Sequence, residues 1–129
     1  MSVQNAVIES VMDMIDGLGL FSTCRRGALG TDPGITCELS VTGTGSVFMD
    51  KRNYIILDLT INAKHPDMQV LSDDMQTLFV TLSRMTAYPS GDGWQMVDIT
   101  IYAQPRVIGR EENGDWLFAG SLHVKYYHM

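Results

Sequence analysis

The feature that most constrains the fold is an alternating segment followed closely by a helical one. In the segment from Tyr54 to Asn62, isoleucine or leucine occupies every second position from 55 to 61, and the positions 58, 60 and 62 between and after them are polar. This alternation is typical of a strand buried on one face. From Pro66 to about Ala87 the apolar spacing becomes that of an amphipathic helix. Its stripe comprises Leu71, Met75, Leu78, Phe79 and Leu82. Because neither element can bury its apolar face alone, the two predict a helix packed on a sheet.

A second helix is predicted at the N-terminus, from Ser2 to about Leu18. Ser2 is a suitable N-cap, and Gly17 with Gly19 supplies a stop. The apolar stripe consists of Val7, Val11, Met14, Ile15 and Leu18. It matches the stripe of the later helix almost position for position, so we expect both helices on the same face of the sheet.

Four further strands are predicted around the central one. Ile35 to Val41 alternates, and Ser46 to Met49 is a short strand after a glycine turn at 42–45. Residues 50–53 form a polar turn. The last two strands cover 94–103 and 116–126, with a long connection between them whose Asn-Gly pair is a strong turn signal.

This order of elements predicts an α+β fold. The expected architecture is one mixed or mainly antiparallel sheet of four to five strands with two helices packed on one face. At 129 residues and 45% hydrophobic content, the chain fits a single domain, residues 1–129, with one core.

Charge and hydropathy argue against nucleic acid and membrane as partners. Fifteen acidic against nine basic residues give a net charge of −6, which disfavours specific nucleic-acid binding and which solubility alone explains. No apolar run approaches the roughly 20 residues needed to cross a membrane. The first residues lack a secretory signal, so we expect synthesis in the cytoplasm. Cys24 and Cys37 are close enough in sequence for a disulfide, but that compartment favours two thiols.

The residues that carry chemistry form no recognisable catalytic or metal-binding pattern. The three histidines share no metal-ligand spacing, and the two cysteines lack a C-x₂-C partner. Asp73-Asp74 and Glu111-Glu112 are adjacent carboxylates, which point in different directions and are more simply solvated surface charge. The sequence therefore predicts no enzyme, no cofactor and no metal.

The outer faces of two predicted strands mix large apolar groups with polar ones. A monomer rarely exposes a large apolar patch without a purpose, so this face predicts a protein–protein surface. The expected subunit interface comprises Tyr54, Ile56, Asp58, Trp94, Met96 and Tyr102. Two alternatives remain for the loop Ser22–Gly34, which carries Arg25-Arg26: it covers this face, or it is a surface loop that orders against a partner.

The last third of the chain carries a longer pattern. It runs from Trp94-Gln-Met-Val-Asp-Ile-Thr-Ile-Tyr102, through a Pro- and Gly-containing connection, to Leu122-His-Val-Lys-Tyr126-Tyr127. It resembles tailed-phage tail terminators, in the branch often called phage minor capsid protein, whose members share the connection P-x-x-I/L-G-x-D/E-x-x-G-x-W/Y. Matching residues are Pro105, Gly109, Gly114 and Trp116, with Glu112 near the acidic position.

The resemblance implies a structural virion or prophage protein. Its copies would form a homo-oligomeric, hexameric ring that caps the tail tube and joins it to the head, with the tail tube protein and the head-completion protein as partners. The expected location is the virion, at the head–tail junction, and the host cytoplasm during assembly. Loop contacts are expected at Arg25, Arg26, Pro105, Gly109 and Glu112. The alternative is a small ligand- or peptide-binding domain that uses the sheet face or the 22–34 loop.

Overall fold

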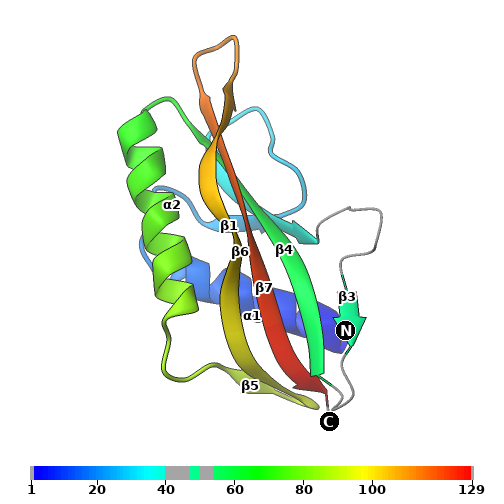
Figure 1. The fold of residues 1–129 in the computed structure, drawn as a ribbon. Helices are drawn as coiled ribbons and strands as arrows, with labels where there is room; N and C mark the ends of the chain where they lie inside the picture. The colour runs from blue at the N-terminus through cyan, green and yellow to red at the C-terminus, as the bar shows by residue number, and fades with distance from the viewer. Residues whose placement is uncertain (1, 40–46, 50–53, 129) are drawn as a thin grey trace.

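The computed structural model describes residues 2–39, 47–49 and 54–128 (Figure 1). The elements in chain order are α1 (Val3–Asp16), β1 (Cys24–Arg26), β2 (Gly34–Leu39), β3 (Val47–Met49), β4 (Tyr54–His65), α2 (Met68–Ser83), β5 (Ser90–Gly91), β6 (Trp94–Arg110) and β7 (Trp116–His128). Two helices and one sheet confirm the α+β class. The predicted turns at 42–45 and 50–53, and Val41 at the end of a predicted strand, lie outside the described residues.

The sheet is larger than predicted. In the described part of the chain it has seven strands, not four to five, in the order β1-β2-β4-β7-β6-β5, with β3 also paired to β4. β1 and β2 are parallel and every other pair is antiparallel, so the sheet is mixed. β2 pairs with the second half of β4, from Leu59 to Lys64, and β3 occupies the space beside residues 55–57.

Both helices pack on one face of the sheet, as predicted. The α2 stripe is buried in full, and Val7, Val11 and Ile15 of α1 are buried with it. They meet the odd-numbered residues of β4 from 55 to 63, which are all buried. Figure 1 shows α1 crossing behind the strands while α2 runs along them. Neither described helix combines the length and the apolar character that a membrane crossing needs.

Helix α2 begins later than predicted. Asp67, and not Pro66, forms its boundary, because the Asp67 carboxylate accepts hydrogen bonds from the backbone N–H of Gln69 (2.9 Å) and of Val70 (3.4 Å). These are two of the donors that a helix N-terminus leaves without an intrahelical partner. Asp67 is itself held by its backbone N–H, which donates to Nδ1 of His65 at 2.9 Å.

Asp67→Ala is expected to lower the free energy of unfolding by about 1 kcal/mol, because both N–H groups lose their side-chain acceptor. Chemical denaturation measures the change. Asp13→Ala, an exposed carboxylate within α1, is the matched control and should stay within about 0.5 kcal/mol of the wild type. Equal effects of the two substitutions would show that Asp67 does not cap the helix.

Strands β6 and β7 form a long hairpin that includes most of the predicted connection. The register extends to the pair Arg110↔Trp116, and the turn occupies the few residues between them. There the N–H of Gly114 donates to the carbonyl of Glu111 at 2.9 Å, and Gly114 adopts a φ of 99°, in the left-handed region that favours glycine. The Asn-Gly turn prediction is therefore confirmed, and Figure 1 shows this end of the hairpin projecting beyond the rest of the sheet.

A β-bulge overturns the predicted faces of the first half of β6. The register shifts between Met96 and Asp98, so the side chains before the bulge point to the opposite face from the one that strict alternation assigns. Trp94 and Met96 are 5% and 1% exposed, and both belong to the core. The Trp94 ring packs directly on Gly91 of β5. The expectation that Trp94 and Met96 lie on an outer subunit interface is wrong.

The short strand β1 brings both cysteines into the core. Cys24 and Cys37 are buried free thiols. A hydrogen bond to the Cys37 side chain, together with burial, raises the pKa of the Cys24 thiol above its ordinary value. Cys24 therefore stays protonated at neutral pH, which makes it a poor nucleophile.

Candidate interaction surface

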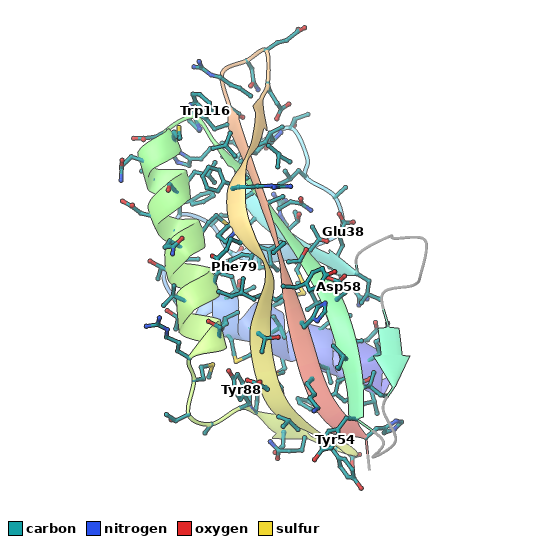
Figure 2. All side chains as sticks on the ribbon, in the orientation of Figure 1. Glu38, Tyr54, Asp58, Phe79, Tyr88 and Trp116 are labelled. Atoms are coloured by element: carbon teal, nitrogen blue, oxygen red, sulfur yellow. The ribbon has the colours of Figure 1, made fainter. Side chains whose placement is uncertain are left out.

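The face of the sheet opposite α1 and α2 is called the outer face. It presents the even-numbered residues of β4 and the odd-numbered residues of β7, because these alternate with the buried ones. Cross-strand pairs on it include Asp58↔His123 and Thr60↔Ser121. Figure 2 shows the side chains of this face, with Asp58 near its middle and Tyr54 at one end.

A polar and aromatic cluster occupies the middle of the outer face. Asp58 is only 8% exposed, and its Oδ2 lies 4.0 Å from Nε2 of His123. The ring of Tyr102 stacks on the His123 ring with centroids 4.2 Å apart and planes 10° apart. Tyr102 itself is 67% exposed. The structure therefore places the predicted residues Asp58 and Tyr102 around His123, which the sequence analysis did not select.

A second cluster lies at the end of the outer face near the start of β4. The rings of Tyr54 and Tyr127 meet edge to face, with centroids 5.4 Å apart. The ammonium of Lys125 lies 4.6 Å from the centroid of the Tyr54 ring, within the range of a cation–π contact. Ile56, the next outward residue of β4, is half-buried and pairs with Lys125. Tyr54 and Ile56 thus lie on the outer face as predicted.

A shallow groove of about 140 Å³ opens on the outer face beside the bulged part of β6. Small side chains line much of it, among them Thr60, Ala103, Ala119 and Ser121. Ile108 also lines it and is 56% exposed. An exposed isoleucine in the wall of a groove of otherwise small residues is a surface that a side chain of a second copy can contact.

The residues of the hairpin that match the phage pattern shape its backbone. The Cα of Pro105 lies against Gly120 of β7, and Gly109 pairs with Leu117. Glu112 is exposed in the turn. The neighbouring Glu111 has the defined partner: its Oε1 lies 2.8 Å from Nζ of Lys64, whose side chain is 3% exposed. A loop contact at Glu112 stays a prediction.

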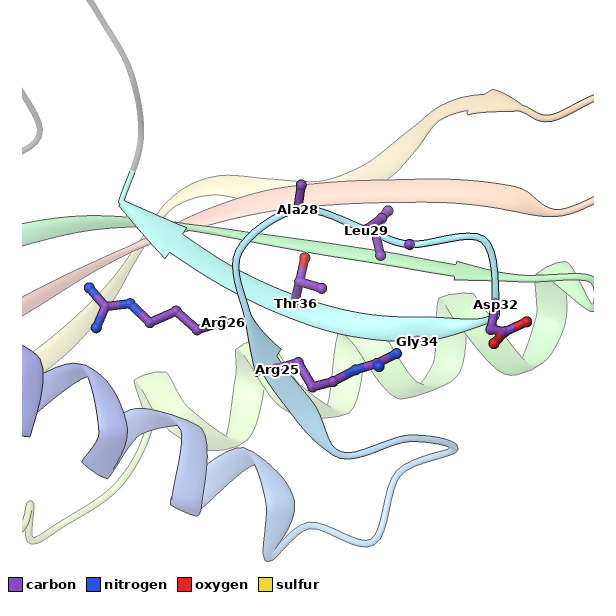
Figure 3. Close-up of a pocket in the computed structure, with 8 residues that line it drawn as sticks. Arg25, Arg26, Ala28, Leu29, Asp32, Gly34 and Thr36 are labelled. Atoms are coloured by element: carbon purple, nitrogen blue, oxygen red, sulfur yellow. The ribbon is translucent and has the colours of Figure 1, made fainter.

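The 22–34 loop covers one edge of the outer face and leaves the middle open. Its residues after β1 pass over Thr36 of β2 (Figure 3), which is 3% exposed, whereas Tyr102 remains largely exposed. The two arginines of the loop separate. Arg25 faces a small cavity beneath the loop, and Nη1 of Arg26 donates to Oδ1 of Asn5 in α1 at 2.7 Å.

Within the described residues, no three side chains of His, Cys, Asp or Glu gather closely enough to hold a metal ion. No protein-family model matches the sequence, and no curated protein matches it either.

Proposed function

We propose that this protein is a structural subunit whose copies pack through the outer face of the sheet to form a ring at the head–tail junction of a tailed phage or prophage. The ring caps the tail tube, contacts a tail tube protein and a head-completion protein, and has six copies. The resemblance of residues 94–127 to tail terminators supports both the location at the head–tail junction and the ring.

One observation supports the choice of this surface: the outer face lies opposite both described helices and exposes large apolar side chains. Tyr102 is 67% exposed and Ile108 is 56% exposed, and the groove of small residues lies beside them. Burying such side chains against a second copy removes apolar area from water, which favours association by about 25 cal/mol per Å². Soluble monomers rarely keep such a patch exposed.

A closed ring needs two different patches on each copy that fit each other, since a self-complementary patch gives a dimer. The outer face offers two distinct features: the exposed side chain of Tyr102, and the groove, which Ile108 lines and Tyr102 does not. We propose that the Tyr102 side chain enters the groove of the neighbouring copy and contacts Ile108 there.

Charged substitutions at these two side chains test this proposal. Tyr102→Glu and Ile108→Glu are expected to reduce self-association at least tenfold, because a carboxylate at the contact loses its hydration when the copies meet. Sedimentation velocity over a concentration series measures the effect. Met68→Glu is the matched control, since Met68 is 43% exposed but belongs to α2, away from the outer face.

The proposal predicts a ring-sized species for the wild type and for Met68→Glu, and smaller species for the other two variants. It is contradicted if Met68→Glu weakens association as much as they do, or if all four proteins remain monomeric at every concentration. Circular dichroism of each variant establishes that it is folded.

The cavity beneath the 22–34 loop favours the second candidate, a domain that binds a small ligand.

A further inference from the structure

The cavity beneath the 22–34 loop has a volume of about 190 Å³, room for a small molecule. It lies between the parallel strands β1 and β2 and the loop that joins them, residues 27–33. Figure 3 shows this loop passing over β2, with Ala28 and Leu29 above Thr36. The parallel pairing forces the chain to cross the outer face between the two strands, and the crossing segment forms the roof of the cavity.

The hydroxyl of Thr36 points into this cavity without a partner. Thr36 is 3% exposed, and its Oγ1 has no hydrogen-bond partner among the described residues. Figure 3 shows that oxygen directed toward the loop at Ala28. A buried hydroxyl without a hydrogen bond is costly, so nearly all such groups in proteins are satisfied. The Thr36 hydroxyl therefore lacks a hydrogen-bond partner, and a molecule bound in the cavity can supply one.

Arg25 supplies a positive charge in the lining of the same cavity. It pairs with Thr36 across β1 and β2, and its Nη2 lies 3.3 Å from the position that a Cβ on Gly34 would take. The glycine thus lets the guanidinium lie close to β2. Among the described carboxylates, none forms an ion pair with Arg25. A guanidinium offers five N–H donors in a planar fork that fits a carboxylate or a phosphate.

The other charged residues of the cavity wall leave this arrangement intact. Asp32 is exposed, and Figure 3 shows its carboxylate directed away from Thr36. Arg26 is turned toward α1, where it binds Asn5. Arg25, which is exposed, and the buried Thr36 are therefore the two residues of the lining that can donate hydrogen bonds to an anion in the cavity.

We propose that this cavity binds a small oxyanion, a carboxylate or a phosphate, between the Arg25 guanidinium and the Thr36 hydroxyl. The guanidinium donates to the oxygens of the anion, and the buried hydroxyl donates the third hydrogen bond. The oxyanion comes from one of two sources: a free small molecule, or a carboxylate side chain of a second copy of this chain.

Thermal unfolding with defined probes tests the site. Sodium acetate and inorganic phosphate, each compared with sodium chloride at the same ionic strength, are expected to raise the Tm of the wild type by about 3 °C or more for at least one probe. Thr36→Val and Arg25→Gln are expected to abolish that increase. Arg26→Gln is the matched control and retains it, because Arg26 also lines the cavity but its guanidinium is held by Asn5 of α1.

Thr36→Val also provides a check on folding. It removes a buried hydroxyl that has no partner and keeps the shape of the side chain, so its Tm in chloride should equal or exceed that of the wild type. The proposal is overturned if neither probe raises the wild-type Tm above the chloride value. It is also overturned if Thr36→Val and Arg25→Gln keep the full increase, since the anion then binds elsewhere.

Sedimentation in acetate and in chloride at equal ionic strength distinguishes the two sources. If the occupant is a carboxylate of a second copy, acetate competes with it and shifts the protein to smaller species. If the occupant is a free molecule, the distribution is the same in both salts. Because the Tm increase is measured independently, failure of the ring proposal leaves this site standing, and the reverse also holds.

Discussion

Gly120→Ala is expected to destabilise the protein by about 3 kcal/mol, the upper part of the range for overpacking a core. A Cβ at this position would lie 2.6 Å from Cζ and 2.8 Å from Cε2 of Phe79, and 2.9 Å from Cα of Pro105. Phe79 is fully buried, so its ring has no solvent to move into. The Pro105 contact is with backbone, which cannot rotate away.

Gly109→Ala in the same hairpin is the control for this substitution. The atom nearest to its added Cβ is Cδ1 of Leu117, at 4.0 Å, so it should change the free energy of unfolding by no more than about 0.5 kcal/mol. Urea denaturation compares the two. Phe79→Leu combined with Gly120→Ala should lose less than the sum of the single changes, because the smaller side chain makes room for the methyl group. An effect of Gly120→Ala no larger than that of Gly109→Ala would show that α2 does not pack this closely on β7.

Glu111→Ala is expected to cost about 3 kcal/mol, because it leaves the buried ammonium of Lys64 without its ion-pair partner. The Lys64 side chain is 3% exposed and its Nζ lies 2.8 Å from Oε1 of Glu111. Glu111 is 37% exposed, which places the expected loss at the lower end of the range for breaking a buried pair.

Glu112→Ala removes the same charge one residue further along and serves as the matched control. Glu112 is exposed in the turn, so the expected change is within about 0.5 kcal/mol. Lys64→Met removes the buried charge itself, so no unpaired ammonium is left. We expect this substitution to leave the free energy of unfolding almost unchanged. The free energies of unfolding of the three variants, measured side by side, test the contribution of this ion pair. Equal values for Glu111→Ala and Glu112→Ala would contradict the ion pair.

The sequence was most informative where one face of a long element is buried. The alternation of β4 and the stripe of α2 identified buried residues correctly, because each has several apolar residues in strict period. The same rule failed at Trp94 and Met96. A single bulged residue reverses the face of every side chain before it, and no local residue pattern marked its position.

Pro105 and Gly109 led to the prediction of a loop where the structure has a strand. Beyond Gln95, β6 pairs only with β7 in the described part of the chain, so one side of the strand is free. A proline, which lacks an N–H, is tolerated on such an edge. The register shifts around residues 101–109 accommodate both residues.

The candidate sites depend on contacts between residues far apart in the chain. Tyr54, Ile56, Asp58 and Tyr102 could be placed on the outer face from alternation alone. The stacking of Tyr102 on His123 depends on the register of β6 with β7, and the Lys64–Glu111 pair joins residues 47 apart. Thr36 carried no signal in the sequence, since its importance comes from the loop that passes over it.

Photo-crosslinking from position 102 tests the central claim most directly, that the outer face is where copies of this chain meet. Tyr102 is replaced by benzoylphenylalanine, and the same replacement at Met68 serves as the control for the helical side. Illumination of the concentrated protein is predicted to give adducts of twice the chain mass from position 102, joined to peptides of β4, β6 or β7. Adducts from Met68 in equal yield, or none from position 102, would contradict it.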